Sequence, residues 1–310
     1  MPNKTDVSQI NRYTIFGFCA IILWSANVAL IRSISEQMGP ITGGGAAYLA
    51  GGIIAVIRLF LKHPLKSIKE VPLNYLFGCG GLFLIYTISL FLAVGLANNR
   101  VQSIELGLVN YLWTPLTIVF SIFILSVKAD YKLIPGTLLA LFGIFSVMTK
   151  ADSVSFASFA ANFMNNPAAY IFGFTAAITW GLYSNLARLW GDPKAIGVVP
   201  LFVLITGIII TIIGLLITEK NQFEVKTAAE IIMFGLITVC SYVFWDMAMQ
   251  QGEIILVASC SYFIPFFSTV VSCIYLKTIP GINVWSGCVF IIAGSLLSWH
   301  SVVGKESYKK

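Results

Sequence analysis

Few side chains in this sequence could do chemistry, and most of those are aromatic rings beside polar residues in long apolar runs. Trp24, Trp113, Trp180 and Trp245 are tryptophans of this kind. A ring face can stack on a planar apolar group and attract an ammonium group, so these positions are candidates for a ring-lined cavity. Core packing is the alternative for each ring. The candidate binding residues are Trp24, Tyr86, Asn110, Tyr111, Trp113, Trp180, Tyr183, Tyr242, Ser261 and Tyr262.

A row of polar side chains follows one apolar segment at the spacing of a helix face. The row begins at Asn110 and continues through Thr114, Thr117 and Ser121. A second row with the same spacing follows 151 residues later and consists of Ser261, Pro265, Ser268 and Ser272. Such rows either line a polar cavity or form hydrogen bonds between packed helices. We favour the cavity for Asn110, because an amide is harder to satisfy in lipid than a hydroxyl group.

Two prolines interrupt the same two segments near their middles. Pro115 and Pro265 each remove one helix hydrogen bond, which frees the carbonyl groups of Tyr111 and Ser261. Free carbonyl groups at membrane depth are tolerated where they face protein or water. We therefore expect a kink at each proline, either as part of a gate or as a feature of helix packing.

Four acidic residues lie within or at the edge of apolar segments: Glu105, Glu230, Asp246 and Glu253. We expect the three glutamates to lie in the first turn of a helix, where the helix dipole favours a charged carboxylate. Asp246 lacks this explanation, and it and Glu105 are the candidates for proton coupling. The sequence has no HExxH motif and no Ser/His/Asp grouping, and its six cysteines form no CxxC pair. We therefore expect no catalytic residues, no metal, no cofactor and no disulfide framework.

The composition is that of a membrane protein. Of the 310 residues, 58% are apolar and only 10% are charged, and the mean hydropathy is +0.88. A soluble domain usually has about a quarter of its residues charged. The composition therefore excludes a soluble enzyme, a disordered chain and a nucleic-acid binder with a basic face. The net charge of +6 instead reflects basic residues that flank membrane segments.

Apolar segments long enough to cross a bilayer recur along the chain. About 20 apolar residues in a helix span the hydrocarbon core, and backbone groups in lipid must find partners within the segment. We therefore expect an all-α membrane protein with ten transmembrane helices at 13–31, 41–57, 73–97, 104–127, 131–149, 168–187, 196–217, 228–249, 254–276 and 282–303.

The distribution of lysine and arginine predicts the orientation of the chain. With a cytoplasmic N-terminus, 13 basic residues face the cytoplasm and 6 face the other side. The excess places both terminal tails, 1–12 and 304–310, in the cytoplasm. A cleaved signal peptide is the alternative for the first segment, but that segment is related to a later one, as described next. We therefore expect it to be a retained helix.

The sequence contains an internal duplication. A shift of 156 residues places Ile15 to Phe18 on the identical residues at 171–174 and Trp24 on Trp180. A shift of 151 residues relates the fourth segment to the ninth and the fifth to the tenth. We therefore expect two five-helix repeats, 13–150 and 168–303. Because five is odd, the second repeat is inverted, which is typical of secondary transporters with a binding site between the repeats.

The polar and aromatic residues are unevenly distributed over the expected helices. The first, third, fourth, sixth, eighth and ninth carry the tryptophan, tyrosine, asparagine and serine residues discussed above. We expect these six helices to line a central cavity. The fifth and tenth helices carry almost no such residues, and we expect them to be peripheral or to contact a second protomer.

Three stretches resemble the bacterial aromatic amino acid exporters of the drug/metabolite transporter superfamily, which have two EamA-type repeats. They are Leu23-Trp24-Ser25 with Leu30-Ile31-Arg32, Val109-Asn110-Tyr111-Leu112-Trp113, and Ser261-Tyr262-Phe263 before Pro265. The chain departs from the pattern at two positions. Thr114 separates Trp113 from Pro115, where the exporters have Trp followed directly by Pro, and Asp246 stands where relatives carry an amide.

The resemblance implies export of Phe, Tyr and Trp across the bacterial cytoplasmic membrane. Together with the inverted repeats, it predicts a secondary transporter that works by alternating access, driven by the substrate gradient. A broader exporter of drugs or metabolites, including aromatic cations and with proton coupling, is the alternative; a membrane-embedded enzyme and a channel are more distant ones. The expected partners are a small-molecule substrate and the lipid bilayer, with no nucleic acid. The sequence does not predict the oligomeric state.

Overall fold

The computed structural model describes residues 11–148, 156–193, 195, 197–217, 219, 224–275 and 282–306. Within these ranges the chain is helical and has no strand. The α-helices are α1 (Arg12–Met38), α2 (Pro40–Lys62), α3 (Gly80–Gly95), α4 (Arg100–Tyr111), α5 (Trp113–Ile124), α6 (Leu133–Met148), α7 (Phe156–Asn165), α8 (Pro167–Trp190), α9 (Val199–Leu216), α10 (Val225–Gln251), α11 (Ile254–Ser261), α12 (Ile264–Tyr275) and α13 (Ile282–Glu306). A 3₁₀-helix, η1 (Leu65–Glu70), and a π-helix, η2 (Asn74–Cys79), precede α3.

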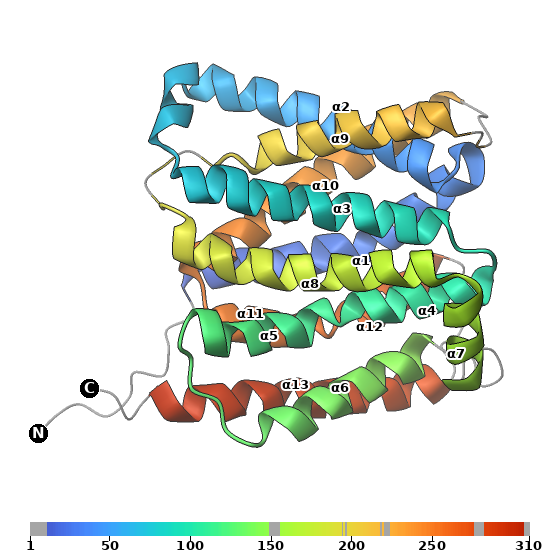
Figure 1. Cartoon of the computed structure of the whole chain (residues 1–310), viewed down its shortest axis with the longest axis vertical. Coiled ribbons are helices and arrows are strands. Elements are labelled where there is room, and N and C mark those ends of the chain that lie inside the picture. The colour runs from blue at the N-terminus through green and yellow to red at the C-terminus, as the bar shows by residue number, and fades with distance from the viewer. Residues whose placement is uncertain are drawn as a thin grey trace, which may run out of the picture.

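The helices form one bundle and lie nearly parallel or antiparallel, with the start of α1 and the end of α13 at the same side (Figure 1). We call this side the terminal end, because α1 begins there and α13 finishes there. The opposite side, where α7 stands across the bundle, is the far end (Figure 1). α1 runs from the terminal end to the far end, whereas α8 runs back from the far end.

Many of these helices are suited to lipid. Six helical segments are long and apolar enough to cross a membrane, judged by length and composition: Pro40–Lys62, Asn74–Gly95, Val101–Ile124, Val199–Leu216, Val225–Gln251 and Trp285–Val302. Large apolar side chains such as Phe77, Phe123 and Leu215 are exposed on the outside of the bundle. An apolar exterior of this kind is suited to hydrocarbon and not to water.

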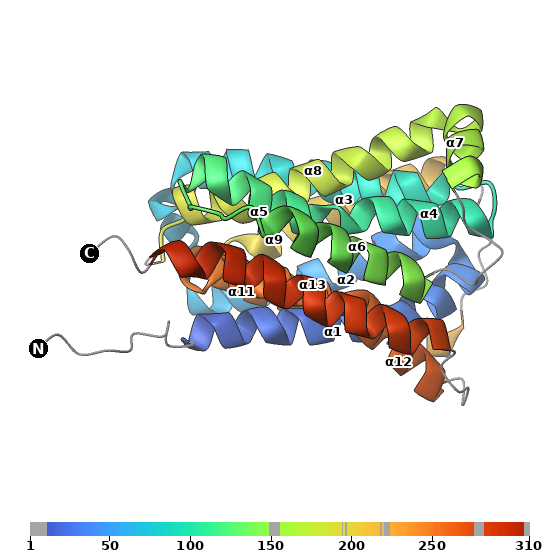
Figure 2. The same ribbon diagram turned by 90° about the horizontal axis from the view of Figure 1, so that it is seen from below.

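The main helix pairs join distant parts of the chain. α1 packs on α10, α2 on α9, α3 on α8, and α6 on α13. The last pair lies side by side along one edge of the bundle (Figures 1 and 2). Each pair combines one helix before residue 150 with one after it, so the two parts of the chain are interlocked.

Glycine permits close approaches between helices, both in the α6–α13 pair and between α2 and α10. A Cβ atom on Gly51 of α2 would lie 2.4 Å from the carbonyl oxygen of Gly235 in α10. A Cβ atom on Gly294 of α13 would lie 2.4 Å from the backbone nitrogen of Ala140 in α6. Both approaches bring backbone against backbone, which no larger residue could allow.

The first two expected membrane segments are longer in the structure than the ranges 13–31 and 41–57. α1 continues to Met38 although its last turns contain the polar residues Ser33 and Gln37. Both side chains form hydrogen bonds with side chains of α10, which stabilise this part of the helix. Gly39, with φ at +81°, then turns the chain, and Pro40 starts α2. Gly39 favours this turn because only glycine adopts a positive φ at little cost.

The expected fourth and ninth segments are each broken in the middle. α4 ends at Tyr111 and α5 begins at Trp113, while α11 ends at Ser261 and α12 begins at Ile264. Both breaks come directly before the proline of the segment, Pro115 or Pro265, whose missing N–H leaves a backbone carbonyl group without its helix partner.

Candidate functional site

A cavity of about 280 Å³ lies in the half of the bundle nearer the far end. It extends from Trp24, near the middle of α1, to Pro40, at the start of α2. Residues of α1, α2, α3, α4, α5, α8, α10 and α12 line it. Seven of the candidate binding residues are among them: Trp24, Tyr86, Asn110, Tyr111, Trp113, Trp180 and Tyr242. No charged side chain of the described residues lines the cavity.

The polar groups of the cavity wall are an amide and hydroxyl groups. The Oδ1 atom of Asn110 is buried and accepts no hydrogen bond within the described part of the chain. A buried acceptor without a partner costs about 1–3 kcal/mol, so a ligand that donates to it would recover that energy. The hydroxyl groups of Tyr48 and Tyr242 share a hydrogen bond of 2.7 Å, and Ser35 and Thr238 also line the cavity.

Four tryptophans form the floor of the cavity on the side of the terminal end. Each ring of this tryptophan cluster (Trp24, Trp113, Trp180 and Trp245) contacts the other three, with centroids 5.2–6.4 Å apart. The first three line the cavity, and Trp245 is fully buried behind them. Trp24 and Trp180, which the shift of 156 residues relates, therefore contact each other in the bundle. Tyr86 and Tyr242 are also 156 residues apart, and both line the cavity.

A buried carboxylate lies behind the tryptophan cluster. Asp246 accepts hydrogen bonds from the hydroxyl groups of Tyr75 and Tyr183 and from Nε2 of Gln250, each 2.8 Å long. The ring of Tyr183 also stacks on Trp180, with centroids 5.0 Å apart. We call these four residues (Tyr75, Tyr183, Asp246 and Gln250) the Asp246 cluster. It fills the core between the tryptophan cluster and the terminal end.

Hydrogen bonds between side chains and the backbone join the helices at the terminal end. Nδ2 of Asn11 donates to the carbonyl oxygen of Gln251 at 2.9 Å, and the backbone N–H of Glu253 donates to Oγ1 of Thr14 at 3.0 Å. Nε of Arg188 donates to the carbonyl oxygen of Met249 at 2.6 Å. These contacts hold the start of α1 and the end of α8 against the connection between α10 and α11.

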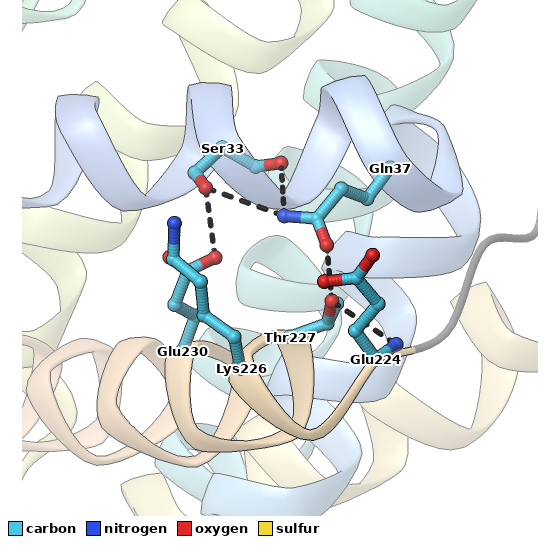
Figure 3. A network of polar contacts seen from close by, with 6 residues as sticks. All are labelled: Ser33, Gln37, Glu224, Lys226, Thr227 and Glu230. Atoms are coloured by element: carbon cyan, nitrogen blue, oxygen red, sulfur yellow. Dashed lines mark hydrogen bonds and ion pairs between the residues drawn. The ribbon is translucent and has the colours of Figure 1, made fainter.

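A second polar network ties α1 to α10 at the far end (Figure 3). Oγ of Ser33 donates to Oε2 of Glu230 at 2.8 Å, and Lys226 lies 3.7 Å from the other carboxylate oxygen. The hydroxyl group of Thr227 donates to the side-chain oxygen of Gln37. α1 and α10 are thus bonded to each other at both ends of the bundle.

Comparison with known proteins identifies the family. The EamA-like transporter family matches the chain twice, over residues 11–149 and 167–299. The chain belongs to the EamA-like transporter family. The aromatic amino acid exporters YddG of Escherichia coli K12 and Salmonella typhimurium are each 30% identical to it over 287 residues, which are 92% of this chain and 96% of each relative. The YddG of Ancylobacter novellus is 27% identical over 289 residues, with the same coverage.

A crystal structure of a protein 23% identical to the transporter has the same fold. It matches with a TM-score of 0.76 over 92% of this chain and 96% of that chain. The family and the apolar helices make the transporter a multi-pass membrane protein that carries a small molecule.

Three of the candidate binding residues of the transporter lie outside the cavity wall. Tyr183 belongs to the Asp246 cluster. Ser261 is buried, and its hydroxyl group lies 3.0 Å from that of Thr114, so this pair joins α11 to α5. Tyr262 is fully buried in the core beside it. The serine and threonine members of the two polar rows therefore include helix contacts, whereas Asn110 faces the cavity.

The acids are not placed as the sequence analysis expected. Glu105 and Glu230 lie in the second turns of α4 and α10, because these helices begin at Arg100 and Val225. Glu253 is the residue before the first turn of α11. Glu105 is fully buried and accepts hydrogen bonds from Ser158 at 2.9 Å, Asn162 at 3.1 Å and the hydroxyl group of Tyr170. It joins α4 to α7 and α8 and does not line the cavity.

Sequence reasoning missed several residues of the site. Tyr48 lies in α2, and the second helix was not expected at the cavity. The sequence analysis did not single out Tyr75 either, which lies in η2 near the start of its segment. Gln250 could have been found, since it follows Asp246 by four residues and so lies on the same helix face.

Proposed function

We propose that this transporter exports aromatic amino acids and that the cavity is their binding site. The exporters that it resembles over nearly its whole length act on aromatic amino acids by name. The observation that carries the proposal is the cavity wall. Among the described residues it combines tryptophan and tyrosine rings with one unpaired amide oxygen and has no charged side chain. Such a wall suits a ligand that is aromatic and has no net charge.

The wall suggests how an aromatic amino acid would bind. Its side chain would stack among the rings of Trp24, Tyr86 and Trp180. Its ammonium group would donate to Oδ1 of Asn110 and lie against a ring face. The hydroxyl groups of Tyr48 and Thr238 would donate to its carboxylate.

The proposed topology has ten transmembrane helices in two inverted five-helix repeats, with both termini in the cytoplasm of a bacterium. In this topology α4 with α5, and α11 with α12, each count as one broken span, and α7 is not a span. The opposite directions of α1 and α8 favour the inversion, and the excess of basic residues favours a cytoplasmic terminal end. The cavity then extends towards the outside, and the tryptophan and Asp246 clusters close the path to the cytoplasm.

Alternating access in this fold would move groups of helices taken from both repeats. α1 and α10 are bonded to each other at both ends, and α2 packs on α9 and α10. α3 and α5 pack on α8. We propose that these two groups rock against each other around the cavity, so the moving parts are not the two halves of the sequence.

We propose that transport is facilitated and follows the substrate gradient. In the part of the chain that the structure describes, the cavity wall has no carboxylate that could exchange a proton with the substrate, and Glu105 lies away from the wall. The alternative is a proton-coupled exporter of broader range, for which Asp246 is the candidate carrier because it lies directly behind the cavity floor.

Transport in liposomes tests the function. Purified transporter is reconstituted with labelled L-phenylalanine, L-tryptophan and L-leucine, and flux is measured with and without a pH gradient. We expect saturable flux of the aromatic amino acids that unlabelled L-tyrosine inhibits, weak flux of leucine, and no accumulation driven by the pH gradient. Non-saturable flux would indicate a channel, and flux of leucine equal to that of phenylalanine would reject the proposed substrate class.

A further inference from the structure

The carboxylate of Asp246 is held by neutral groups alone. Its three donors are two tyrosine hydroxyl groups and the amide of Gln250, and Asp246 forms no ion pair within the described residues. It is 3% exposed, so water contributes little to its solvation. A buried carboxylate is stable only while such donors stay in place, because its charge is strongly disfavoured without them.

The donors come from different helices, between the tryptophan cluster and the terminal end. Tyr75 lies in η2, Tyr183 in α8, and Asp246 and Gln250 in α10. In the rocking motion proposed above, α10 moves away from α3 and α8, which takes Asp246 away from both tyrosines. η2 is a π-helix, a rare form that recurs at functional sites, and it supplies the bond from Tyr75 to Asp246. The same motion must also break the bonds between α8 and α10 that Ser184 accepts from Trp245 and that Arg188 donates to the carbonyl oxygen of Met249.

Opening therefore leaves the carboxylate with one donor at the depth of the membrane, facing the path. We propose that Asp246 then binds the α-ammonium group of the substrate, as an entry site that is separate from the cavity. An ammonium group has three donors and a positive charge, so it replaces the bonds that the tyrosines give up. Rings adjoin the carboxylate as well, since Tyr183 donates to it and Trp245 precedes it in α10.

This inference rests on the proposed function and adds a requirement to it. No described residue of the cavity wall is a carboxylate, whereas the entry site has one, Asp246. The two faces of the transporter therefore recognise the amino group differently. A substrate that binds from the terminal end needs an ammonium group to bind Asp246. The binding of a substrate from the far end depends less on that group.

The test measures KM at each face in vesicles that contain the transporter in one orientation. L-Phenylalanine is the substrate, and two analogues are inhibitors: phenethylamine, which has the ammonium group without the carboxylate, and 3-phenylpropionate, which has the reverse. For Asp246→Asn we expect KM at the terminal face to rise about tenfold or more, as for the loss of one charged hydrogen bond. Phenethylamine should lose its inhibition at that face, while inhibition by 3-phenylpropionate and KM at the far face stay within about twofold.

Two further variants control for charge and folding. Glu105→Gln removes another buried carboxylate that accepts three side-chain hydrogen bonds, but at a position away from the path. It should leave the ratio of the two KM values unchanged. Asp246→Glu keeps the charge and should restore inhibition by phenethylamine at the terminal face. The far-face KM of each variant also reports whether the protein is folded.

Three results would overturn the inference. The first is a terminal-face KM that Asp246→Asn leaves unchanged. The second is an equal rise of KM at both faces, which would make Asp246 a structural residue. The third is accumulation driven by a pH gradient and abolished by Asp246→Asn, which would make it a proton carrier. A wild-type protein that moves no aromatic amino acid would instead reject the proposed function itself.

Discussion

At the scale of single residues, Trp24 contributes both to the cavity wall and to the tryptophan cluster beneath it. Its ring is partly exposed to the cavity, so its replacement removes ligand contact more than core packing. We expect Trp24→Ala to raise KM for L-phenylalanine about tenfold, since the burial of such a ring contributes about 1–3 kcal/mol. Trp285→Ala is the matched control: its ring is 55% exposed on the outside of α13, and KM should stay within about twofold. Equal effects of the two changes would contradict a binding role for Trp24.

For Asn110 we predict that one substitution raises the stability of the protein and lowers its transport activity. Because its Oδ1 atom is buried without a partner, Asn110→Leu should stabilise the folded protein by about 1 kcal/mol and raise its melting temperature. The same change should weaken uptake, because the acceptor for the substrate is lost. Asn185→Leu is the control, since Nδ2 of Asn185 donates to the carbonyl oxygens of Thr117 and Gly181, and this change should destabilise. A lower melting temperature for Asn110→Leu would show that its amide is needed for folding.

The residues of the cavity could be predicted in part because polar groups are rare in this chain. In an apolar sequence, the asparagine and the tryptophans stand out, and most of them do meet at one place. The sequence predicted less well which neighbour each of these side chains contacts. Ser261 has the spacing of a cavity residue, yet its hydroxyl group bonds to Thr114, because a pattern of spacing gives the helix face and not the neighbour that covers it.

At the scale of helices, the positions of proline determine where a helix can bend, and those of glycine determine where two helix backbones can come into contact. The prolines indicated where the fourth and ninth segments break. The longer ends of α1 and α2 and the presence of α7 could not be predicted. They depend on contacts with distant residues, such as those of Ser33 with Glu230 and of Ser158 with Glu105.

The glycine contact between α2 and α10 gives a prediction at this scale. Gly51→Ala would place a Cβ atom 2.4 Å from the carbonyl oxygen of Gly235, so the two helices must move apart. We expect a loss of about 1–3 kcal/mol in stability and a lower melting temperature of the purified protein. Gly81→Ala is the control, because a Cβ atom there meets nothing within 4 Å and alanine favours the helix. A melting temperature unchanged in Gly51→Ala would mean that the backbones are not so close.

At the scale of the whole molecule, the interlocked pairs explain why sequence halves and structural units differ. The duplication predicts two five-helix repeats, one in each half of the sequence. The structure instead pairs α1 with α10, α2 with α9, α3 with α8 and α6 with α13. A shift between two parts of a sequence reveals which helices are related. Which helices pack together depends instead on which of their faces fit, as at the close approach of Gly294 in α13 to Ala140 in α6.

The orientation of the whole molecule gives the last prediction. Lys66 is exposed in η1, between the end of α2 at the terminal end and η2, and Met164 is exposed in α7 at the far end. Because 13 of the 19 basic residues belong to the side of the terminal end, that end should face the cytoplasm. We expect a membrane-impermeant thiol reagent to label Met164→Cys in intact cells, and Lys66→Cys only after the membrane is opened. Labelling of Lys66→Cys in intact cells would reverse the orientation, and the cavity would then extend towards the cytoplasm. In that case the Asp246 cluster would close the outer side, and the transporter would hold its cavity open to the compartment from which an exporter takes its substrate.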